Sequence, residues 1–127
     1  MLFRSDAVVP KDNNLFATVS RVNLIGALRR VSLLSNERSK GVILAFSPGH
    51  LEVSTTNPDL GEAREEFDID YKGKKLNIGF NARYFLDVLD IVKDENIIVA
   101  LKSETNACMI KSEMDAGYTY VIMPMRI

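Results

Sequence analysis

The side chains with the most obvious potential for catalysis are few and far apart. The chain of 127 residues holds one histidine, His50, and one cysteine, Cys108. Nucleophilic catalysis needs a nucleophile beside a base, and a zinc site usually takes four Cys or His ligands. His50 follows a Pro-Gly turn sequence without a Ser or Cys partner motif, and the i, i+3 pair Asp87 and Asp90 is commonplace on a polar helix face. We therefore expect no enzyme activity, no metal and no cofactor.

The C-terminal residues form an apolar, methionine-rich segment. Val121, Met123 and Met125 are spaced at i, i+2, and thioether side chains form a polarizable surface that adapts to different shapes. Pro124 stops further strand pairing, which would leave the last residues as an exposed lip beside a sheet. The same spacing is also that of the buried face of any terminal strand. From these residues alone both interpretations stay open, and burial is the commoner one.

Length and composition place these residues on a single domain, 1–127. With 46% hydrophobic and 26% charged residues, the chain can bury a core. Sixteen basic residues oppose seventeen acidic ones, so no overall basic field gathers a polyanion. The single cysteine cannot form an internal disulfide, no secretion signal is evident, and the apolar runs are far shorter than the ~20 residues that cross a bilayer. We expect a cytoplasmic protein without a membrane span.

The hydrophobic pattern predicts one order of elements twice, because alternating runs indicate strands and a 3.6-residue period indicates helices. The first unit comprises a strand at 14–20, a helix at 22–35 and strands at 41–47, 51–57 and 62–70. The second comprises a strand at 76–80, a helix from 81 to about 92 and strands at 96–102, 107–112 and 118–124. We expect an irregular linker over 1–12, repeats at about 13–70 and 74–124, and an α+β fold. In that fold two βαβββ repeats place two helices on one face of antiparallel sheets.

The two predicted helices differ in how their apolar residues are arranged. Ser20 or Asn23 can cap the first helix and Asn81 the second. Leu33 points away from the apolar stripe of the first helix and Leu34 lies at its margin, so neither is expected to be buried in the core. The apolar stripe of the first helix comprises Leu24, Ile25, Leu28 and Val31. That of the second comprises Tyr84, Phe85, Val88, Leu89, Ile91 and Val92.

The C-terminal string YVIMPMRI, from Tyr120 to Ile127, closely resembles the end of the bacterial DNA polymerase III β sliding clamp. The similarity covers about residues 8–127 without an evident gap, and the segment Met1 to Asp6 departs from it. In that family each chain carries three copies of a DNA-clamp (processivity) fold, two chains close head to tail into a ring, and duplex DNA passes through it. This sequence resembles the third copy only. Further matching stretches are 34–37 with 41–42, 57–58, 78–81, Tyr84 and 86–89.

The resemblance implies a non-catalytic processivity factor with a pocket for short linear peptides of polymerases, the clamp loader and repair proteins. Tyr84 suits such a pocket, because a phenol has an apolar body and a polar tip. Its position on an apolar helix face is equally typical of a core residue. The pocket residues implied in this domain are Val8, Asn81, Tyr84, Thr105, Val121, Met123, Pro124, Met125 and Arg126.

Two further surfaces are implied by the resemblance. Leu33, Leu34, Glu62 and Glu65 correspond to the ring interface with the first domain of a second clamp chain, although a fraying helix end and solvated charges are the plainer interpretation. Contact with duplex DNA would be non-specific, through arginines that face the hole, although such arginines on a net-acidic domain more often serve solubility. Those arginines are Arg21, Arg29, Arg30 and Arg83.

Three functions follow as hypotheses. The first is the third domain of a bacterial sliding clamp, cytoplasmic and associated with the nucleoid. The second is a free-standing adaptor or decoy that binds replication peptides without encircling DNA. The third is a generic α+β oligomerisation domain in which the methionine-rich segment is only core.

Overall fold

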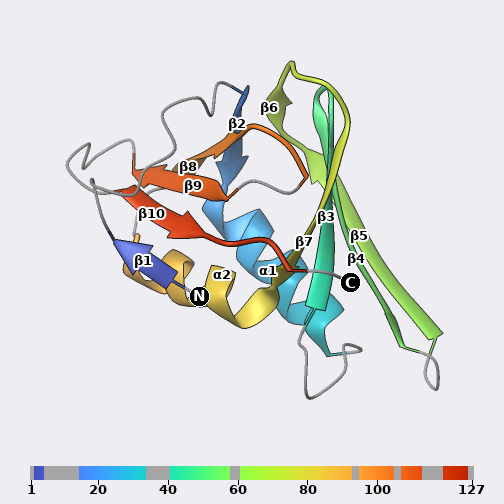
Figure 1. Cartoon of the computed structure of the whole chain (residues 1–127). Helices are drawn as coiled ribbons and strands as arrows, with labels where there is room; N and C mark the ends of the chain where they lie inside the picture. The colour runs from blue at the N-terminus through green and yellow to red at the C-terminus, as the bar shows by residue number, and fades with distance from the viewer. Residues whose placement is uncertain are drawn as a thin grey trace.

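The computed structural model describes residues 2–4, 15–33, 41–57, 61–92, 95–104, 107–112 and 119–125 (Figure 1). The first repeat contains β2 (Leu15–Ser20), α1 (Arg21–Ser32), β3 (Gly41–Ser47), β4 (His50–Asn57) and β5 (Gly61–Asp68). The second contains β7 (Leu76–Asn81), α2 (Ala82–Ile91), β8 (Asn96–Leu101), β9 (Cys108–Ser112) and β10 (Thr119–Ile122). Two short strands, β1 (Leu2–Arg4) and β6 (Asp70–Tyr71), complete the set.

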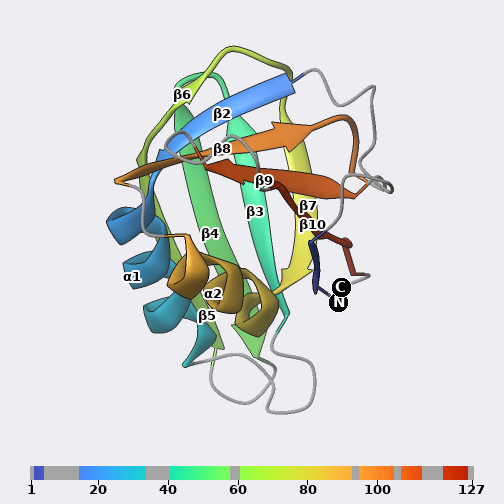
Figure 2. The ribbon, with the colours of Figure 1, turned by 90° about the vertical axis from the view of Figure 1, so that its left-hand side faces the viewer.

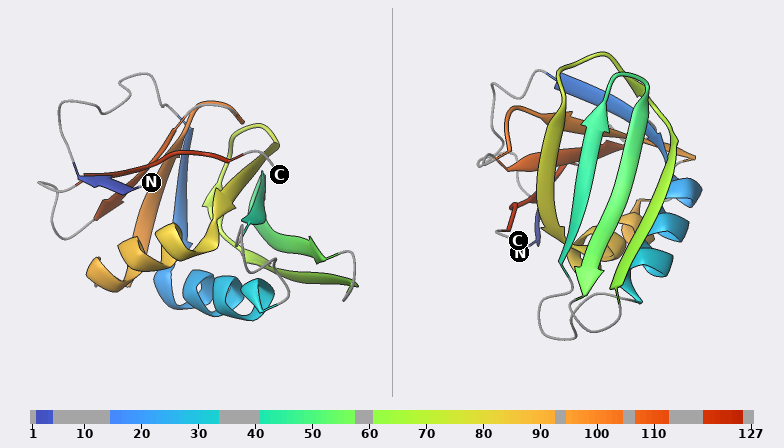
Figure 3. Two further views of the ribbon diagram at one scale, coloured as in Figure 1. Left: turned by 60° about the horizontal axis from the view of Figure 1, so that its bottom comes forward. Right: turned by 90° about the vertical axis from the view of Figure 1, so that its right-hand side faces the viewer.

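The two repeats exchange their first strands between the two sheets. Sheet A has the order β1-β10-β9-β8-β2-β6, and sheet B has the order β5-β4-β3-β7. The first strand of each repeat therefore lies beside the other repeat: β2 pairs with β8, and β7 pairs with β3, both antiparallel. The right-hand view of Figure 3 shows sheet B face on, with the strands of sheet A crossing behind it. This exchange makes one domain of the two repeats.

Both helices lie on the same side of the sheets, as Figure 2 and the left-hand view of Figure 3 show. α1 packs on β2, β3, β4 and β5, whereas α2 packs on β7 and β10, and the two helices contact each other. The Phe80 and Phe85 rings meet edge to face with their centroids 5.0 Å apart. The predicted α+β class, with two helices on one face of antiparallel sheets, is confirmed.

Each helix begins at a polar side chain that caps its first turn. The Ser20 hydroxyl accepts from the Asn23 N–H at 3.3 Å, and the Asn81 side chain accepts from the Arg83 N–H at 2.9 Å. A cap of this kind satisfies one of the backbone donors that a helix start leaves open. Since Ser20 and Asn81 are the last residues of β2 and β7, each helix starts as soon as its strand ends.

Most boundaries lie within two residues of the expected ones, and three differences matter for the fold. The expected linker over 1–12 is wrong for residues 2–4, which form β1 and pair with β10. The expected strand at 62–70 divides after Asp68, because the Ile69 N–H donates to the Gly49 carbonyl and β6 then joins β2 in the other sheet. α1 ends at Ser32, earlier than the expected residue 35. In the part of the chain that the structure describes, no helix is long and apolar enough to cross a membrane.

Candidate functional site

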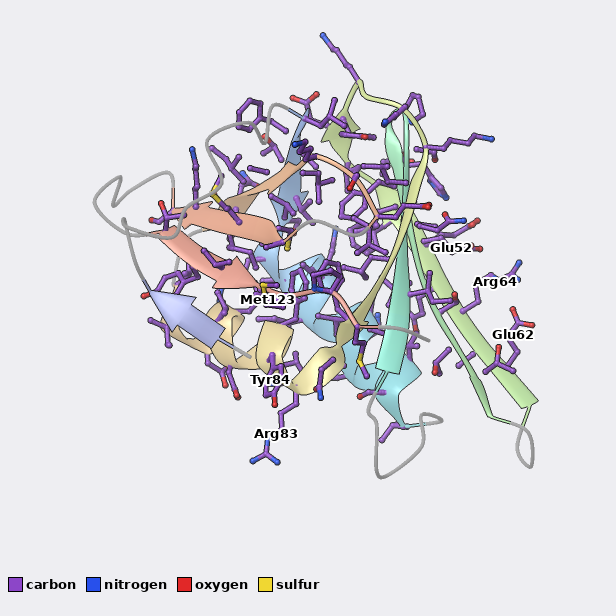
Figure 4. All side chains as sticks on the ribbon, viewed as in Figure 1. Glu52, Glu62, Arg64, Arg83, Tyr84 and Met123 are labelled. Carbon is purple, nitrogen blue, oxygen red and sulfur yellow. The ribbon has the colours of Figure 1, made fainter. Side chains whose placement is uncertain are left out.

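Tyr84 and Met123 are exposed apolar side chains on two elements that pack together. Tyr84 lies in the first turns of α2 with 37% of its surface exposed, and Met123 follows β10 with 46% exposed. Figure 4 places Met123 just beyond the strand and Tyr84 on the helix that packs against that strand. The polar cap at Asn81 fixes where α2 starts and therefore where Tyr84 emerges. Together they offer an aromatic ring and a thioether to a partner.

The segment after β10 is held at a defined place. β10 ends at Ile122, and residues 123–125, which we name the C-terminal lip, cross from sheet A to sheet B (Figure 1). The Met125 N–H donates to the Gly79 carbonyl on β7 at 2.8 Å. Pro124 and Met125 are half-buried. The expected strand at 118–124 is therefore too long, because β10 ends at Ile122, and Pro124 lacks the N–H that a continued strand would need.

Val121 departs from the role expected of it. Only 3% of its surface is exposed, because it packs with Ala100 and Met109 in a small cluster separate from the main core. Its neighbours Tyr120 and Ile122 face the main core instead. The i, i+2 spacing with Met123 is therefore that of one strand face, but the two residues differ in exposure. A side chain as buried as Val121 fixes β10 and leaves little surface for a partner.

The remaining expected pocket residues divide into two groups. Asn81 is half-buried, and its side-chain oxygen is engaged in the cap of α2, so its observed role is structural. Val8, Thr105 and Arg126, together with the ring-interface residue Leu34, lie outside the described residues. Of the expected pocket residues, Tyr84 and Met123 are exposed and Pro124 and Met125 are half-buried, and we call these four the candidate pocket. Gly79, which anchors the lip, has no signal in the sequence that would have indicated this role.

Leu33 and the edge strand β5 form a second exposed area. Leu33 follows α1 with 81% of its surface exposed, and β5 is the outermost strand of sheet B. Glu62, on that strand, accepts from Arg64 at 2.6 Å, and Arg64 also lies 3.1 Å from Glu52 (Figure 4). The edge thus presents a charged rim beside one exposed leucine.

Glu65 and Arg30, which the sequence assigned to different surfaces, form one ion pair. The Arg30 Nε donates to Glu65 Oε2 at 2.5 Å, and a second guanidinium nitrogen donates to Oε1 at 2.7 Å. The hydrogen bond from Arg30 lowers the pKa of the Glu65 carboxyl and raises that of the guanidinium, with burial opposing both shifts. This bidentate contact ties α1 to β5.

The four arginines expected to face DNA are not equivalent. Arg21 Nε donates to the Leu89 carbonyl at 2.7 Å, near the end of α2, and Arg30 is held by Glu65. Arg29 and Arg83 have exposed side chains that make no ion pair with any other described residue. Two of the four are therefore engaged in joining elements, and two project from the helices toward solvent.

The histidine and the cysteine lie apart from this site. The His50 Nε2 is 3.2 Å from Glu66, and its Nδ1 is 3.7 Å from Asp68, on the outer face of sheet B. Cys108 is buried, and burial raises the pKa of its thiol, which disfavours the reactive thiolate. Among the described residues, no group of three His, Cys, Asp or Glu side chains could hold a metal ion.

The fold matches solved structures closely. A sliding clamp from Pseudomonas aeruginosa superposes with a TM-score of 0.92 at 34% identity, covering 96% of this chain and 34% of that one. A clamp from Bartonella birtlesii, solved bound to griselimycin, gives a TM-score of 0.91 at 32% identity, covering 95% of this chain and 33% of that one. The architecture is therefore that of a sliding-clamp domain.

The sequence comparisons specify which domain it is. The family described as "DNA polymerase III beta subunit, C-terminal domain" matches residues 6–126, and the chain belongs to that family. The beta sliding clamp of Pseudomonas putida is 34% identical over 122 residues, which are 96% of this chain and 33% of that protein. That of Haemophilus influenzae is 39% identical over 101 residues, 80% of this chain and 28% of that protein. The chain thus spans about one third of the length of these relatives.

Proposed function

We propose that this domain supplies part of a pocket for short linear peptides of replication and repair proteins. The observation that carries the proposal is the exposure of Tyr84 and Met123 on two packed elements, α2 and the segment after β10. Met123 belongs to the lip and Tyr84 to the helix that packs against β10, and exposed apolar side chains on neighbouring elements suit a partner with apolar side chains of its own. Thioethers adapt to several such partners, because they are polarizable and unbranched.

The relatives support a ligand-binding role for this fold. The clamps of Bartonella birtlesii and Pseudomonas aeruginosa have both been solved bound to griselimycin. In the present chain the lip would receive a ligand without a large rearrangement, because the Met125 N–H is already fixed on Gly79. Preorganisation of this kind lowers the entropy lost on binding.

We propose also that Leu33 and the β5 edge form one end of a head-to-tail ring interface. Leu33 is exposed, and burial of a leucine contributes about 1.5–3 kcal/mol. Glu62 would complement basic side chains of the facing first domain. In the assembled bacterial clamp, a cytoplasmic and non-catalytic processivity factor, Arg29 and Arg83 would screen phosphates of duplex DNA without distinguishing bases.

The peptide proposal is tested by mapping a peptide on the labelled protein. A peptide bearing Gln, Leu and Phe is titrated into ¹⁵N-labelled chain while the amide resonances are followed. The expected result is a set of saturable shifts at Tyr84, Met123 and Met125, with Phe16 and His50 unchanged on the far strands. Shifts confined to residues outside α2 and the lip, or none at millimolar peptide, would contradict the proposal.

The ring proposal is tested separately by sedimentation. The chain is mixed with the first domain of the Pseudomonas putida clamp, and the expected result is a complex that the Leu33→Lys variant does not form. If wild type and variant both sediment as monomers while the peptide still binds, the adaptor hypothesis replaces the ring hypothesis. If neither the peptide nor the first domain binds, only a generic α+β domain is left.

A further inference from the structure

The outer edge of β10 is occupied by the chain's own first strand. β1 pairs antiparallel with β10, with Leu2 opposite Ile122, Phe3 opposite Val121 and Arg4 opposite Tyr120. This pairing makes β1 the outermost strand of sheet A. Figure 1 shows β1 lying along β10 on the side of α2. The pairing therefore ends at Ile122, one residue before Met123 of the candidate pocket.

β1 is a short strand at the edge of its sheet. It has 3 residues, and residues 5–14 separate it from β2. Short edge strands gain few backbone hydrogen bonds. The family match begins at residue 6, so β1 also lies outside the segment shared with the family. A peptide that displaced β1 would therefore replace a strand outside that shared segment.

β10, in contrast, pairs with β9 along its other edge and packs on the main core. It pairs with β9 from Thr119 opposite Lys111 to Ile122 opposite Cys108. Tyr120 and Ile122 are buried in the main core. When β1 leaves, β10 would stay in place and expose a row of unpaired backbone groups. Such an edge is a template for an extended segment of another chain.

We propose that the edge of β10 is a strand-addition site for the extended peptide that enters the candidate pocket, with β1 as its internal competitor. This inference rests on the proposed function, since it assigns the peptide a backbone contact in addition to Tyr84 and Met123. A peptide whose apolar side chains lie against Tyr84 and Met123 has β10 directly beside it, because the lip continues from that strand. Continuing along β10, the peptide would take the backbone partners that β1 now holds.

The competition predicts how affinity depends on β1. An apparent dissociation constant equals the intrinsic one divided by the fraction of molecules with a free site. If β1 is paired about nine-tenths of the time, its removal should tighten binding about tenfold. Two variants remove the pairing: deletion of residues 1–4, and Phe3→Pro, since proline lacks a donor and is poorly tolerated in a strand. Phe3→Val is the matched control, because valine favours strands.

The experiment compares four chains: wild type, the deletion of residues 1–4, Phe3→Pro and Phe3→Val. For each chain it measures the affinity for a fluorescein-labelled peptide bearing Gln, Leu and Phe, and the hydrogen exchange of the backbone amides of Thr119–Ile122. We expect tighter binding and faster exchange of alternate β10 amides in the deletion and in Phe3→Pro. Added peptide should restore protection of those amides, and Phe3→Val should behave as wild type. Because the two disruptive variants alter β1 differently, agreement between them excludes an effect of one sequence change on folding.

Three outcomes overturn the inference, and they can be told apart. Equal affinity in all four chains, with binding still lost on Tyr84→Ala, would contradict the competition with β1 but not the proposed pocket. Absence of binding in all four chains removes the pocket and the competition together. Unchanged β10 exchange in the deletion also overturns the inference, because it shows that β1 does not protect that edge.

Discussion

The backbone N–H of Met125 donates to the carbonyl of Gly79 at 2.8 Å and so joins the C-terminal lip to the edge strand of the opposite sheet. Met125 follows β10 of sheet A, whereas Gly79 belongs to β7 of sheet B. The same β7 continues into α2, which carries Tyr84. One hydrogen bond therefore fixes the lip relative to the helix that forms the other side of the candidate pocket.

Loss of that hydrogen bond should weaken peptide binding more than it weakens the fold. Met125→Pro removes the donor, and a backbone hydrogen bond contributes about 0.5–1.5 kcal/mol to stability. Met125→Ala keeps the donor and is the matched control for the lost side chain. We expect Met125→Pro to bind the labelled peptide more weakly than Met125→Ala in a fluorescence anisotropy titration. Equal affinities of the two variants would show that the anchor on Gly79 does not order the pocket.

The Arg30–Glu65 pair should make a small, pH-dependent contribution to stability. Arg30 lowers the pKa of the Glu65 carboxyl below its ordinary value of 4.5. A carboxylate with a lowered folded pKa contributes stability above its unfolded pKa, and that contribution is lost as the pH falls through the folded pKa. The melting temperature of wild type should therefore exceed that of Glu65→Gln at pH 6–7, and the difference should shrink as the pH falls below 4.5 and vanish once the pH is below the lowered folded pKa.

Salt provides an independent check on that ion pair. The two side chains are 62% and 30% exposed, so 1 M NaCl should reduce the difference between wild type and Glu65→Gln. Asp87→Asn, on the exposed side of α2, is the control for loss of a negative charge. A difference that persists unchanged at pH 3 would mean that Glu65 stabilises the fold by some means other than its charge.

The order of elements and the helix starts could be predicted from the sequence, because these depend on local patterns. Ser20 and Asn81 were expected caps, and both accept from a backbone N–H of the first turn. The exchange of β2 and β7 between the sheets was not predictable, since period and propensity do not specify which strands pair. β6 was missed for a related reason: Asp70 continues the alternation of β5 but pairs with Thr18 in the other sheet.

The candidate site was predicted only in part, because local patterns do not show which side chains long-range contacts bury. The resemblance implied that Tyr84 and Met123 line a pocket, whereas their spacing alone favoured the core, and both are exposed. Val121 lies two residues before Met123 but is buried against Ala100 and Met109, contacts that no local pattern reveals. Ile91 was expected on the apolar face of its helix but is exposed, because it is the last residue of α2.

Phe85 should be among the most costly residues to truncate. It is fully buried and packs edge to face on Phe80. Phe85→Ala removes that contact and leaves a cavity, which typically costs about 3–5 kcal/mol. Leu33→Ala, at an exposed position, should change the free energy of unfolding by less than about 0.5 kcal/mol. Urea unfolding of both variants checks this contrast, and similar losses would contradict the assignment of Phe85 to the core and Leu33 to the surface.

The most direct test of the peptide pocket compares two exposed residues on one helix. Tyr84 and Ile91 both lie on α2 and are 37% and 55% exposed, but only Tyr84 belongs to the candidate pocket. Anisotropy titration of the labelled peptide should show affinity reduced at least about tenfold by Tyr84→Ala and unchanged within about twofold by Ile91→Ala. Equal affinity for wild type, Tyr84→Ala and Ile91→Ala would contradict the pocket.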